Sequence, residues 1–310
     1  MPAFRTRRRR STIRRSRVTV TVPGTTANLG TGFDTLGLAL DLPNRCTVER
    51  IPGTRVVWAG ASPVAKKMAD RAAALFFGRT GSKRFGISFR VRGEVPPASG
   101  LGSSVTVRLG LIAGLNRLSG SPLDPEGLLN LVAELEGHPD NAAPAVLGGF
   151  VVSTLERAGG KSCVRYVRVP LNHQLKFILV IPKIEIMTER ARKVLPRSYS
   201  RSDAVHNLSR ACLLTASIIE RRFENLWTGA EDRFHQPYRA RLVRPLYPVL
   251  RAAKKAGALG GWLSGSGPTI CLAACGNVKR ILRAVQRSIP KNVKWTHKVV
   301  SADNRGFRIA

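Results

Sequence analysis

Apolar and polar residues alternate in several segments of the chain, and this pattern predicts strands. Val18, Val20 and Val22 alternate with threonines, and residues 85–91 carry an apolar side chain at every second position. Successive side chains of a strand point to opposite faces, so each segment would present one apolar face to a core. Apolar runs predict further strands at residues 149–155, 164–169, 176–181, 259–264, 269–274 and 293–300.

A second spacing, with apolar residues three and four positions apart, predicts helices between these strands. Residues 104–118 carry apolar side chains at positions 105, 109, 112 and 115, which share one face of a helix. Asp124 and Pro125 are the residue types of an N-cap and a first helical position, so a helix should begin there and run to about Glu136. Helices are also predicted at residues 61–77, 201–222, 242–256 and 277–288. This mixed order is typical of an α+β fold.

The composition indicates a soluble protein without a membrane helix. Of the 310 residues, 43% are hydrophobic, which is enough for a substantial core. The longest apolar runs, such as residues 177–181, are far shorter than the roughly 18 residues that a membrane helix needs. The five cysteines are scattered, odd in number and without the C-x-x-C spacing of zinc sites, which predicts reduced core residues of a cytoplasmic enzyme.

The net charge of +32 is the most unusual feature of the composition. Eight arginines and no acid lie within residues 1–17, which predicts a disordered basic tail or, alternatively, an organellar transit peptide. Most of the excess charge belongs to the rest of the chain. Such a surface attracts polyanions in a salt-dependent way, but no aromatic platform or recognisable nucleic-acid-binding module accompanies it. Non-specific nucleic-acid contact is therefore the most that the charge predicts.

Residues 97–104, Pro-Ala-Ser-Gly-Leu-Gly-Ser-Ser, lead into a predicted helix and have the composition of a phosphate-binding loop. Gly100 and Gly102 lack a Cβ atom, so the backbone can approach a ligand closely. At a helix start, uncapped N–H groups would face the anion, and a serine hydroxyl could bind phosphate or its magnesium ion. On its own, the segment is equally compatible with an ordinary glycine-rich turn capped by serines.

Two further glycine-rich segments, at residues 23–42 and 260–269, favour the phosphate-binding interpretation. In order and spacing, the three segments resemble those of the GHMP kinases, over roughly residues 18–300. The run Glu-Gly-His-Pro-Asp-Asn at residues 136–141 is similar to that of the homoserine kinases within this family.

The resemblance implies a GHMP kinase fold of two domains. Residues 18–170 would form an ATP-binding half similar to domain 2 of ribosomal protein S5, and residues 171–310 a ferredoxin-like half. The active site would lie in the cleft between the halves, because the phosphate loop belongs to the first half and the third glycine-rich segment to the second.

ATP and Mg²⁺ are the cofactors that the resemblance implies. Ser104 and a glutamate near the end of the helix at residues 124–136 would hold Mg²⁺ against the phosphates. We favour Glu136. Glu134 is an acceptable alternative, because the loop between the glutamate and Asp140 is shorter than in other family members; a solvated helix end is the structural alternative for either. The ATP-binding residues would be Pro97, Ala98, Ser99, Gly100, Leu101, Gly102, Ser103 and Ser104.

Asp140 and Asn141 are the catalytic residues that the resemblance implies. An aspartate at this position resembles the base that sister kinases use on the acceptor hydroxyl, whereas in the homoserine branch both residues would orient the substrate, with Asp140 as an optional base. His138 would bind the substrate, shape the loop or transfer a proton. The structural alternative is that the Asp-Asn pair forms an Asx turn or a helix cap.

Homoserine is a zwitterion, so its pocket needs a cation for the carboxylate. By resemblance, Arg192 and Arg239 would meet this carboxylate, because a planar guanidinium suits two-point binding of a carboxylate. Thr188 would lie beside Arg192. Most other arginines in so basic a chain are expected to be surface charge, and the position within a motif distinguishes these two.

The ammonium and hydroxyl groups of homoserine need an acid or an amide. By resemblance, Asn28 and Asp34 would meet them, and Gly265 would let the backbone come close to the substrate. Gln236 departs from the family, in which an acidic residue is common at this position. Val105 and Thr106 also depart from the family, in which small residues are usual after the paired serines. This departure is expected to affect the packing of the loop but not the reaction.

The resemblance implies ATP-dependent phosphorylation of L-homoserine to O-phospho-L-homoserine in threonine biosynthesis. The alternative is another small-molecule GHMP kinase acting on mevalonate or an isoprenoid-pathway alcohol, and a nucleic-acid-binding protein is a more remote one. The family also implies a homodimer. We expect no membrane partner and a cytoplasmic location.

Overall fold

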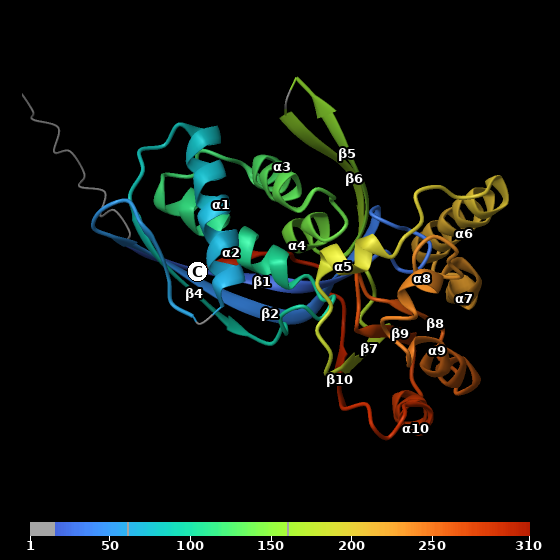
Figure 1. Cartoon of the computed structure of the whole chain (residues 1–310). Coiled ribbons are helices and arrows are strands. Elements are labelled where there is room, and N and C mark those ends of the chain that lie inside the picture. Colours follow the sequence, from blue (N-terminus) through green and yellow to red (C-terminus); the bar gives the residue numbers. More distant parts are fainter. Residues whose placement is uncertain (1–15, 61, 160) are drawn as a thin grey trace, which may run out of the picture.

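Two sheets stacked between layers of helices make up the computed structural model of the chain (Figure 1). The structure describes residues 16–60, 62–159 and 161–310. The predicted tail up to residue 15, and Ala61 at the start of a predicted helix, lie outside the described residues. Arg17, predicted as the last residue of the tail, begins the first strand. In the part of the chain that is described, no helix has the length and apolar character to cross a membrane.

The first sheet is built mainly from the first half of the chain. Its strands follow the order β11-β1-β2-β4-β3, and β5 pairs with both β2 and β6. Only the pairing of β3 with β4 is parallel among the described strands. The strands are β1 (Arg17–Ala27), β2 (Leu36–Ile51), β3 (Val56–Trp58), β4 (Gly86–Gly93), β5 (Phe150–Ala158), β6 (Lys161–Val169) and β11 (Arg308–Ile309). Because β11 pairs with β1, the end of the chain returns to the first sheet.

Helices α1 (Pro63–Thr80), α2 (Ser103–Leu118), α3 (Pro125–Glu136) and α4 (Ala142–Leu147) cover one face of this sheet (Figure 1). Asp124 caps α3 as predicted, because its side chain accepts a hydrogen bond from the Gly127 N–H at 2.8 Å. Helix α2 is buried on almost every side, since it packs between the sheet and the other helices. The prediction of a single apolar face was therefore too narrow for α2.

The second sheet comes from the second half of the chain, in the order β10-β7-β9-β8, with every pairing antiparallel. Its strands are β7 (Lys176–Pro182), β8 (Gly260–Leu263), β9 (Ile270–Ala274) and β10 (Trp295–Val300). Around it lie α5 (Thr188–Lys193), α6 (Arg201–Ile219), η1 (Phe223–Asn225), α7 (Leu226–Gly229), α8 (Gln236–Arg239), α9 (Leu246–Lys255) and α10 (Val278–Ser288). All strands and helices predicted for this half are present within a few residues.

The longest strand, β2, was not predicted, because its first residues belong to a glycine-rich segment. Leu36, Leu38, Leu40 and Leu42 pack in the core between the two sheets, whereas Val48 packs in the core under the helices. Even-numbered residues of one strand normally share a face. The pairing of β1 with β2 shifts between Pro23 and Gly24, at the point where β2 changes its face. Because of this irregularity, the first part of β2 packs in the core between the sheets, and its later part packs in the core under the helices.

The cysteines divide between the core and the surface. Cys46 and Cys271 are buried, and burial raises the pKa of the Cys46 thiol to about 12. Cys212 and Cys275 are exposed, so the prediction that the cysteines are core residues is wrong for these two.

Candidate active site

A cleft of about 610 Å³ lies where the loop before α2 meets α5, α8 and the turn between β8 and β9. Every predicted site residue lines it except Leu101, which is fully buried in the core between the sheets. Residues from the two ends of the sequence thus meet in one place. The predicted residues in the lining are Asn28, Asp34, Pro97, Ala98, Ser99, Gly100, Gly102, Ser103, Ser104, Glu136, His138, Asp140, Asn141, Thr188, Arg192, Arg239 and Gly265.

The glycines of the phosphate loop are required by the packing of the protein itself. Gly100 and Gly102 have φ values of 78° and 71°, in the left-handed region. A Cβ atom on Gly100 would lie 2.3 Å from the carbonyl oxygen of Ser264, and one on Gly102 would lie 2.1 Å from the hydroxyl of Thr25. Gly102 caps α2 without a side-chain hydrogen bond, so the first N–H groups of this helix remain available to an anion.

The three glycine-rich segments contact one another. The N–H of Gly265 donates to the carbonyl of Ala27 at 3.1 Å, and the N–H of Thr269 donates to the carbonyl of Ser99 at 3.2 Å. The side chain of Ser264 donates to the carbonyl of Gly100 at 2.7 Å. The third segment therefore fixes the position of the phosphate loop relative to the first.

Ser104 and Glu136 lie together at the start of α2. The Ser104 hydroxyl donates to Glu136 Oε2 at 3.0 Å, and Arg108 forms an ion pair with Oε1 at 2.5 Å. Oxygen ligands beside a phosphate site suit Mg²⁺, which takes one or two protein ligands together with phosphate oxygens. Glu134 instead pairs with Arg79 at 2.7 Å and does not line the cleft. The geometry favours Glu136 of the two predicted alternatives.

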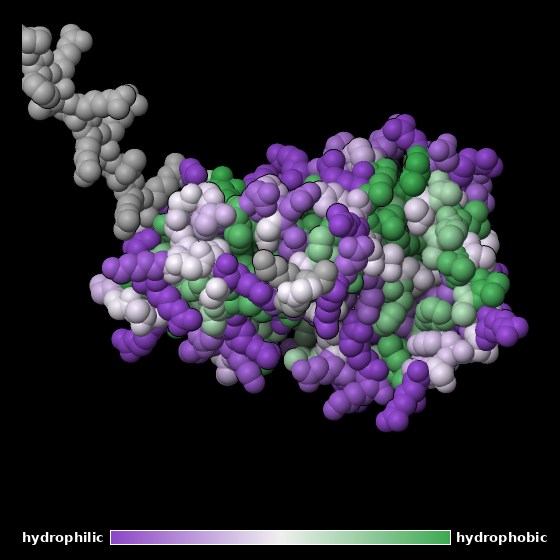
Figure 2. Space-filling model, turned by 90° about the horizontal axis from the view of Figure 1, so that it is seen from above, coloured by the Kyte–Doolittle hydropathy of each residue, from purple (hydrophilic) through white to green (hydrophobic). Residues whose placement is uncertain are grey.

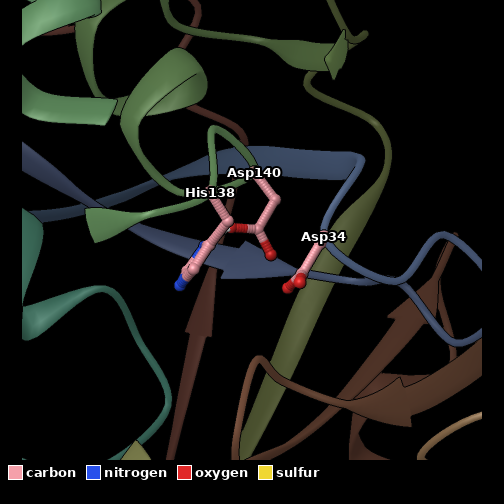
Figure 3. A group of neighbouring side chains, drawn as sticks. All are labelled: Asp34, His138 and Asp140. Carbon is pink, nitrogen blue, oxygen red and sulfur yellow. Dashed lines mark hydrogen bonds and ion pairs between the residues drawn. The ribbon is translucent and has the colours of Figure 1, made fainter. Parts of the chain in front are cut away.

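His138 and Asp140 form a buried charged pair, seen in Figure 3 beside Asp34. Their atoms Nδ1 and Oδ1 are 2.5 Å apart. Burial alone would lower the pKa of His138, but the charge of Asp140 and this hydrogen bond raise it to about 9. Burial alone would raise the pKa of Asp140, but the charge of His138 and their hydrogen bond hold it below its usual value. At neutral pH the pair is thus imidazolium and carboxylate.

Asn141 connects this pair to the first strand. Its Nδ2 donates to Asp140 Oδ1 at 3.1 Å, and its Oδ1 accepts a hydrogen bond from the Thr25 hydroxyl at 2.6 Å. Asn141 precedes α4 but makes no side-chain capping bond. The helix-cap alternative therefore does not hold for Asn141.

Asp34 and Arg192 form a second charged pair within the cleft. The guanidinium donates to both carboxylate oxygens, at 2.7 and 3.0 Å. Asp34 has φ 56° and Asn28 has φ 68°, a conformation that Asp and Asn tolerate better than most residues. The N–H of Asp34 donates to Asn28 Oδ1 at 3.0 Å, and Asn28 Nδ2 donates to the carbonyl of Gly265 at 3.0 Å.

Thr188 and Arg239 complete the predicted substrate side. Thr188 begins α5 and is exposed at the rim of the cleft. Arg239 is 2% exposed and donates from Nη1 to the carbonyl of Gly265 at 3.0 Å. Gln236, the departure from the family, is buried: its amide accepts from the N–H of Leu263 at 2.7 Å and donates to the carbonyl of Ala230 at 3.4 Å. Only an amide, and not a carboxylate, can make both bonds.

Sequence reasoning missed several residues of the site. Arg108 lies one helical turn after Ser104 on α2, a spacing that could have indicated its contact with the same glutamate. Several apolar residues also line the cleft, and no motif marks them, because they come from four separate elements, β3, α1, β4 and α2. These residues include Trp58, Val64, Met68, Val91 and Val107.

Comparison with known proteins assigns the family. Residues 64–149 match the model of the GHMP kinases N terminal domain, and residues 214–291 match that of the GHMP kinases C terminal. The homoserine kinase of Moorella thermoacetica is 37% identical over 293 residues, which cover 93% of this chain and 98% of that protein. The homoserine kinase of Halothermothrix orenii is 37% identical over 299 residues, 93% of this chain and 95% of that protein.

The fold leads to the same family. The crystal structure of homoserine kinase from Cytophaga hutchinsonii has a TM-score of 0.84 at 25% identity and covers 96% of this chain and 98% of that one. This likeness confirms the predicted α+β fold of the GHMP kinases. The chain therefore belongs to the GHMP kinase family and, within it, to the homoserine kinases.

Proposed function

We propose that the protein transfers the γ-phosphoryl group of ATP to the hydroxyl of L-homoserine, giving O-phospho-L-homoserine on the route to threonine. One observation carries this assignment: a carboxylate and a guanidinium, Asp34 and Arg192, face the same cleft as the phosphate loop. They match the two charges of an amino acid zwitterion. The relatives named above are homoserine kinases, which supports the same acceptor.

ATP binds with its triphosphate at the start of α2. The free N–H groups and the positive end of the helix dipole attract the phosphate oxygens. The apolar residues of the cleft, such as Trp58 and Met68, suit the nucleotide base, since a planar base gains from contact with aromatic and apolar side chains.

Ser104 and Glu136 would hold Mg²⁺, because their oxygens lie together at the start of α2. The ion, when bound, neutralises charge on the phosphate oxygens. Arg108 fixes the Glu136 carboxylate from the other side, so that Oε2 points to the Ser104 hydroxyl. Glu136 is thereby oriented before the nucleotide arrives.

Asp140 orients the acceptor hydroxyl for in-line attack. The hydroxyl oxygen bonds to the γ-phosphorus as the bond to ADP breaks, and the hydroxyl proton leaves toward the Asp140 carboxylate. Because the pKa of Asp140 is held low, it is a weak base, and its main effect is on position. His138 keeps Asp140 ionised, and Asn141 fixes its rotamer.

Mevalonate is the second acceptor to test, because other GHMP kinases phosphorylate alcohols of this kind. It has a carboxylate for Arg192 but no ammonium group for Asp34. Breaking the Asp34–Arg192 pair for mevalonate would leave the Asp34 carboxylate without its guanidinium partner. The charge pattern therefore favours homoserine.

We also propose a homodimer, supported by an apolar stripe on α6. Val205, Leu208 and Ile219 are 59%, 66% and 45% exposed, and the exposed Cys212 lies between them at helical spacing. Figure 2 shows apolar residues gathered on the side where α6 lies in Figure 1. Light scattering on the wild type and on Leu208→Glu tests this: a dimer that becomes monomeric supports it, and a monomeric wild type overturns it.

Two lesser properties complete the proposal. Non-specific nucleic-acid contact would involve a hollow of about 310 Å³ between α9 and α10, whose charged residues are all basic: Lys255, Arg280, Arg283 and Arg287. RNA affinity that does not fall as salt rises would contradict it.

A cytoplasmic location is supported by the exposed thiols, which persist in reducing compartments.

Identification of the product tests the proposed reaction. After incubation with ATP, Mg²⁺ and L-homoserine, ³¹P NMR and mass spectrometry should show a phosphate monoester on the homoserine side chain, formed in equal amount to ADP. ADP with inorganic phosphate alone would mean hydrolysis and would overturn the proposal.

A further inference from the structure

Arg239 is a buried arginine that uses three of its five N–H donors in bonds to the protein. Nε donates to the carbonyl of Ala191 at 3.1 Å, while Nη1 donates to the carbonyl of Gly265 at 3.0 Å and to Nδ1 of His235 at 3.2 Å. Among the described residues, Nη2 has no hydrogen-bond partner, and Arg239 lines the cleft. The guanidinium is thus held from three sides and offers one nitrogen to a ligand.

The contacts of His235 determine which of its nitrogens carries the proton. Nε2 lies 2.8 Å from the carbonyl oxygen of Gly30, which can only accept, so Nε2 carries the hydrogen. Arg239 can only donate, so Nδ1 must present its lone pair. The side chain of His235 is fully buried, and this burial lowers the pKa of the ring. Asp232 and Asp34 oppose that shift and Arg239 adds to it.

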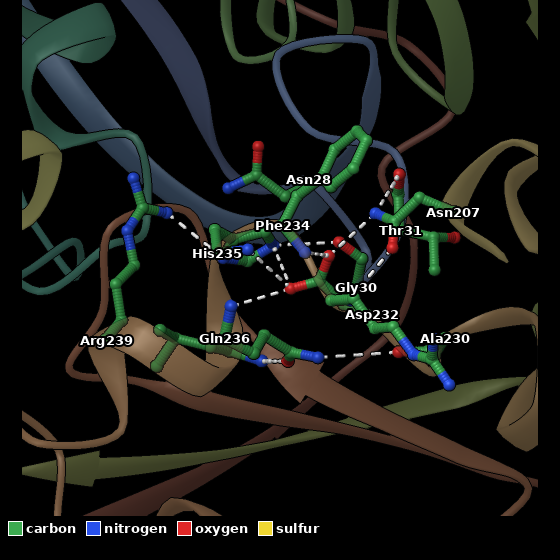
Figure 4. A network of polar contacts seen from close by, with 12 residues as sticks. Asn28, Gly30, Thr31, Asn207, Ala230, Asp232, Phe234, His235, Gln236 and Arg239 are labelled. Atoms are coloured by element: carbon green, nitrogen blue, oxygen red, sulfur yellow. Dashed lines mark hydrogen bonds and ion pairs between the residues drawn. The ribbon is translucent and has the colours of Figure 1, made fainter. Parts of the chain in front are cut away.

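Asp232 holds the backbone from which His235 projects (Figure 4). Its carboxylate accepts from the N–H groups of Phe234, His235 and Gln236 at 2.8, 2.9 and 2.6 Å, and from Asn207 Nδ2 at 2.8 Å. It lies 3.6 Å from Nε2 of His235, too far for a hydrogen bond. Asp232 therefore fixes the turn that leads into α8, and the carbonyl of Gly30 fixes the ring.

We propose that His235 is a positioning residue for Arg239: through Nδ1 it turns the guanidinium so that Nη2 faces the substrate carboxylate. This inference rests on the proposed function, since the carboxylate is that of homoserine. His235 belongs to the second half of the chain, and its anchor Gly30 belongs to the first glycine-rich segment. The ring thus contacts both Arg239 and the segment that carries Asn28 and Asp34.

Two substitutions separate positioning from packing, because each keeps one nitrogen of the ring. In His235→Asn, the amide oxygen can replace Nδ1 as the acceptor for Arg239, but the bond to Gly30 is lost. In His235→Gln, the amide N–H can replace Nε2 as the donor to Gly30, but the acceptor for Arg239 is lost. Both remove ring volume, so a packing role would affect them alike.

We expect His235→Gln to raise the KM for homoserine about tenfold or more, because a factor of this size corresponds to the loss of one charge-assisted hydrogen bond. The KM for ATP should stay within about twofold of the wild-type value. His235→Asn should stay within about threefold of the wild type for both substrates. Equal increases in the two variants, or an unchanged His235→Gln, would overturn the proposal. A wild type that does not phosphorylate homoserine would instead contradict the proposed function.

The wild-type protein gives a second test that needs no variant to fold. Nitrogen-15 NMR of the histidine rings should show His235 as the neutral tautomer with hydrogen on Nε2 from pH 6 to pH 8. The ring signals of the wild type are assigned through their connection to the backbone of His235. A ring with hydrogen on Nδ1, or on both nitrogens, could not accept from Arg239 and would overturn the proposal.

Discussion

Arg192 and Asp34 are bound to each other by two hydrogen bonds, of 2.7 and 3.0 Å. From the sequence, we predicted that these two residues bind opposite ends of one substrate. In this arrangement they neutralise each other, and a zwitterion can replace both partners at once: its ammonium takes the place of Arg192 on Asp34, and its carboxylate takes the place of Asp34 on Arg192. An acceptor with a single charge would bind one of the two residues and leave the other without its ion-pair partner.

Loss of either residue should weaken homoserine binding without unfolding the protein. The two side chains are 38% and 32% exposed, so their pair contributes only about 0–1 kcal/mol to stability. We expect Asp34→Ala and Arg192→Ala to raise the KM for homoserine about tenfold or more. Steady-state kinetics and thermal unfolding measure the two effects. Arg165→Ala, which breaks the exposed Arg165–Glu156 pair outside the cleft, is the control and should leave the KM unchanged.

Removal of the Asp140 carboxylate should affect catalysis rather than nucleotide binding. Asp140 is 2% exposed, its carboxylate contacts His138 and Asn141, and it is not among the residues that we assign to ATP. We expect Asp140→Ala to lower kcat about a hundredfold or more while the Kd for ATP changes less than about threefold. Stopped-flow or calorimetric titration gives the Kd. Comparable losses in kcat and in ATP affinity would contradict this role.

The two neighbouring glutamates of α3 offer a matched pair for the metal. Glu136 contacts Ser104, whereas Glu134 pairs with Arg79 outside the cleft. Glu136→Gln should lower kcat/KM about tenfold or more and raise the Mg²⁺ concentration needed for half-maximal rate. Glu134→Gln should match the wild type in a Mg²⁺ titration. The reverse order would assign the metal to Glu134.

The His138–Asp140 pair should make stability depend on pH in the alkaline range. The pKa of His138 is raised from 6.5 to about 9, so its protonated form stabilises the folded protein fully below about pH 6.5 and ceases to do so as pH rises through 9. The shift corresponds to roughly 3 kcal/mol. The difference in free energy of unfolding between wild type and His138→Gln should therefore shrink between pH 6 and pH 9.5. A constant difference would show that the pair is not charged.

Most of the fold could be predicted because its signals are local. The cap at Asp124, the apolar spacing of α2 and the alternation in β1 each depend on neighbours in the chain. Strand β2 was missed because its glycine-rich start reads as a loop. The short α8 was missed because it depends on Asp232, whose contacts form only in the folded chain.

The site residues were predictable by type but not by partner. The sequence marked Asp34 and Arg192, yet their ion pair joins residues 158 positions apart, a distance over which no spacing rule operates. Arg108 and His235 were missed because each acts on a marked residue and carries no motif of its own. Apart from the helical spacing of Arg108 and Ser104, these contacts depend on the tertiary structure.

The acceptor is the central claim, and a coupled ADP-release assay on the wild-type enzyme tests it most directly. The assay compares L-homoserine, mevalonate and no acceptor at equal ATP and Mg²⁺. We predict sustained ADP release with L-homoserine and only background rates in the other two reactions. Turnover with mevalonate and none with L-homoserine would contradict the account.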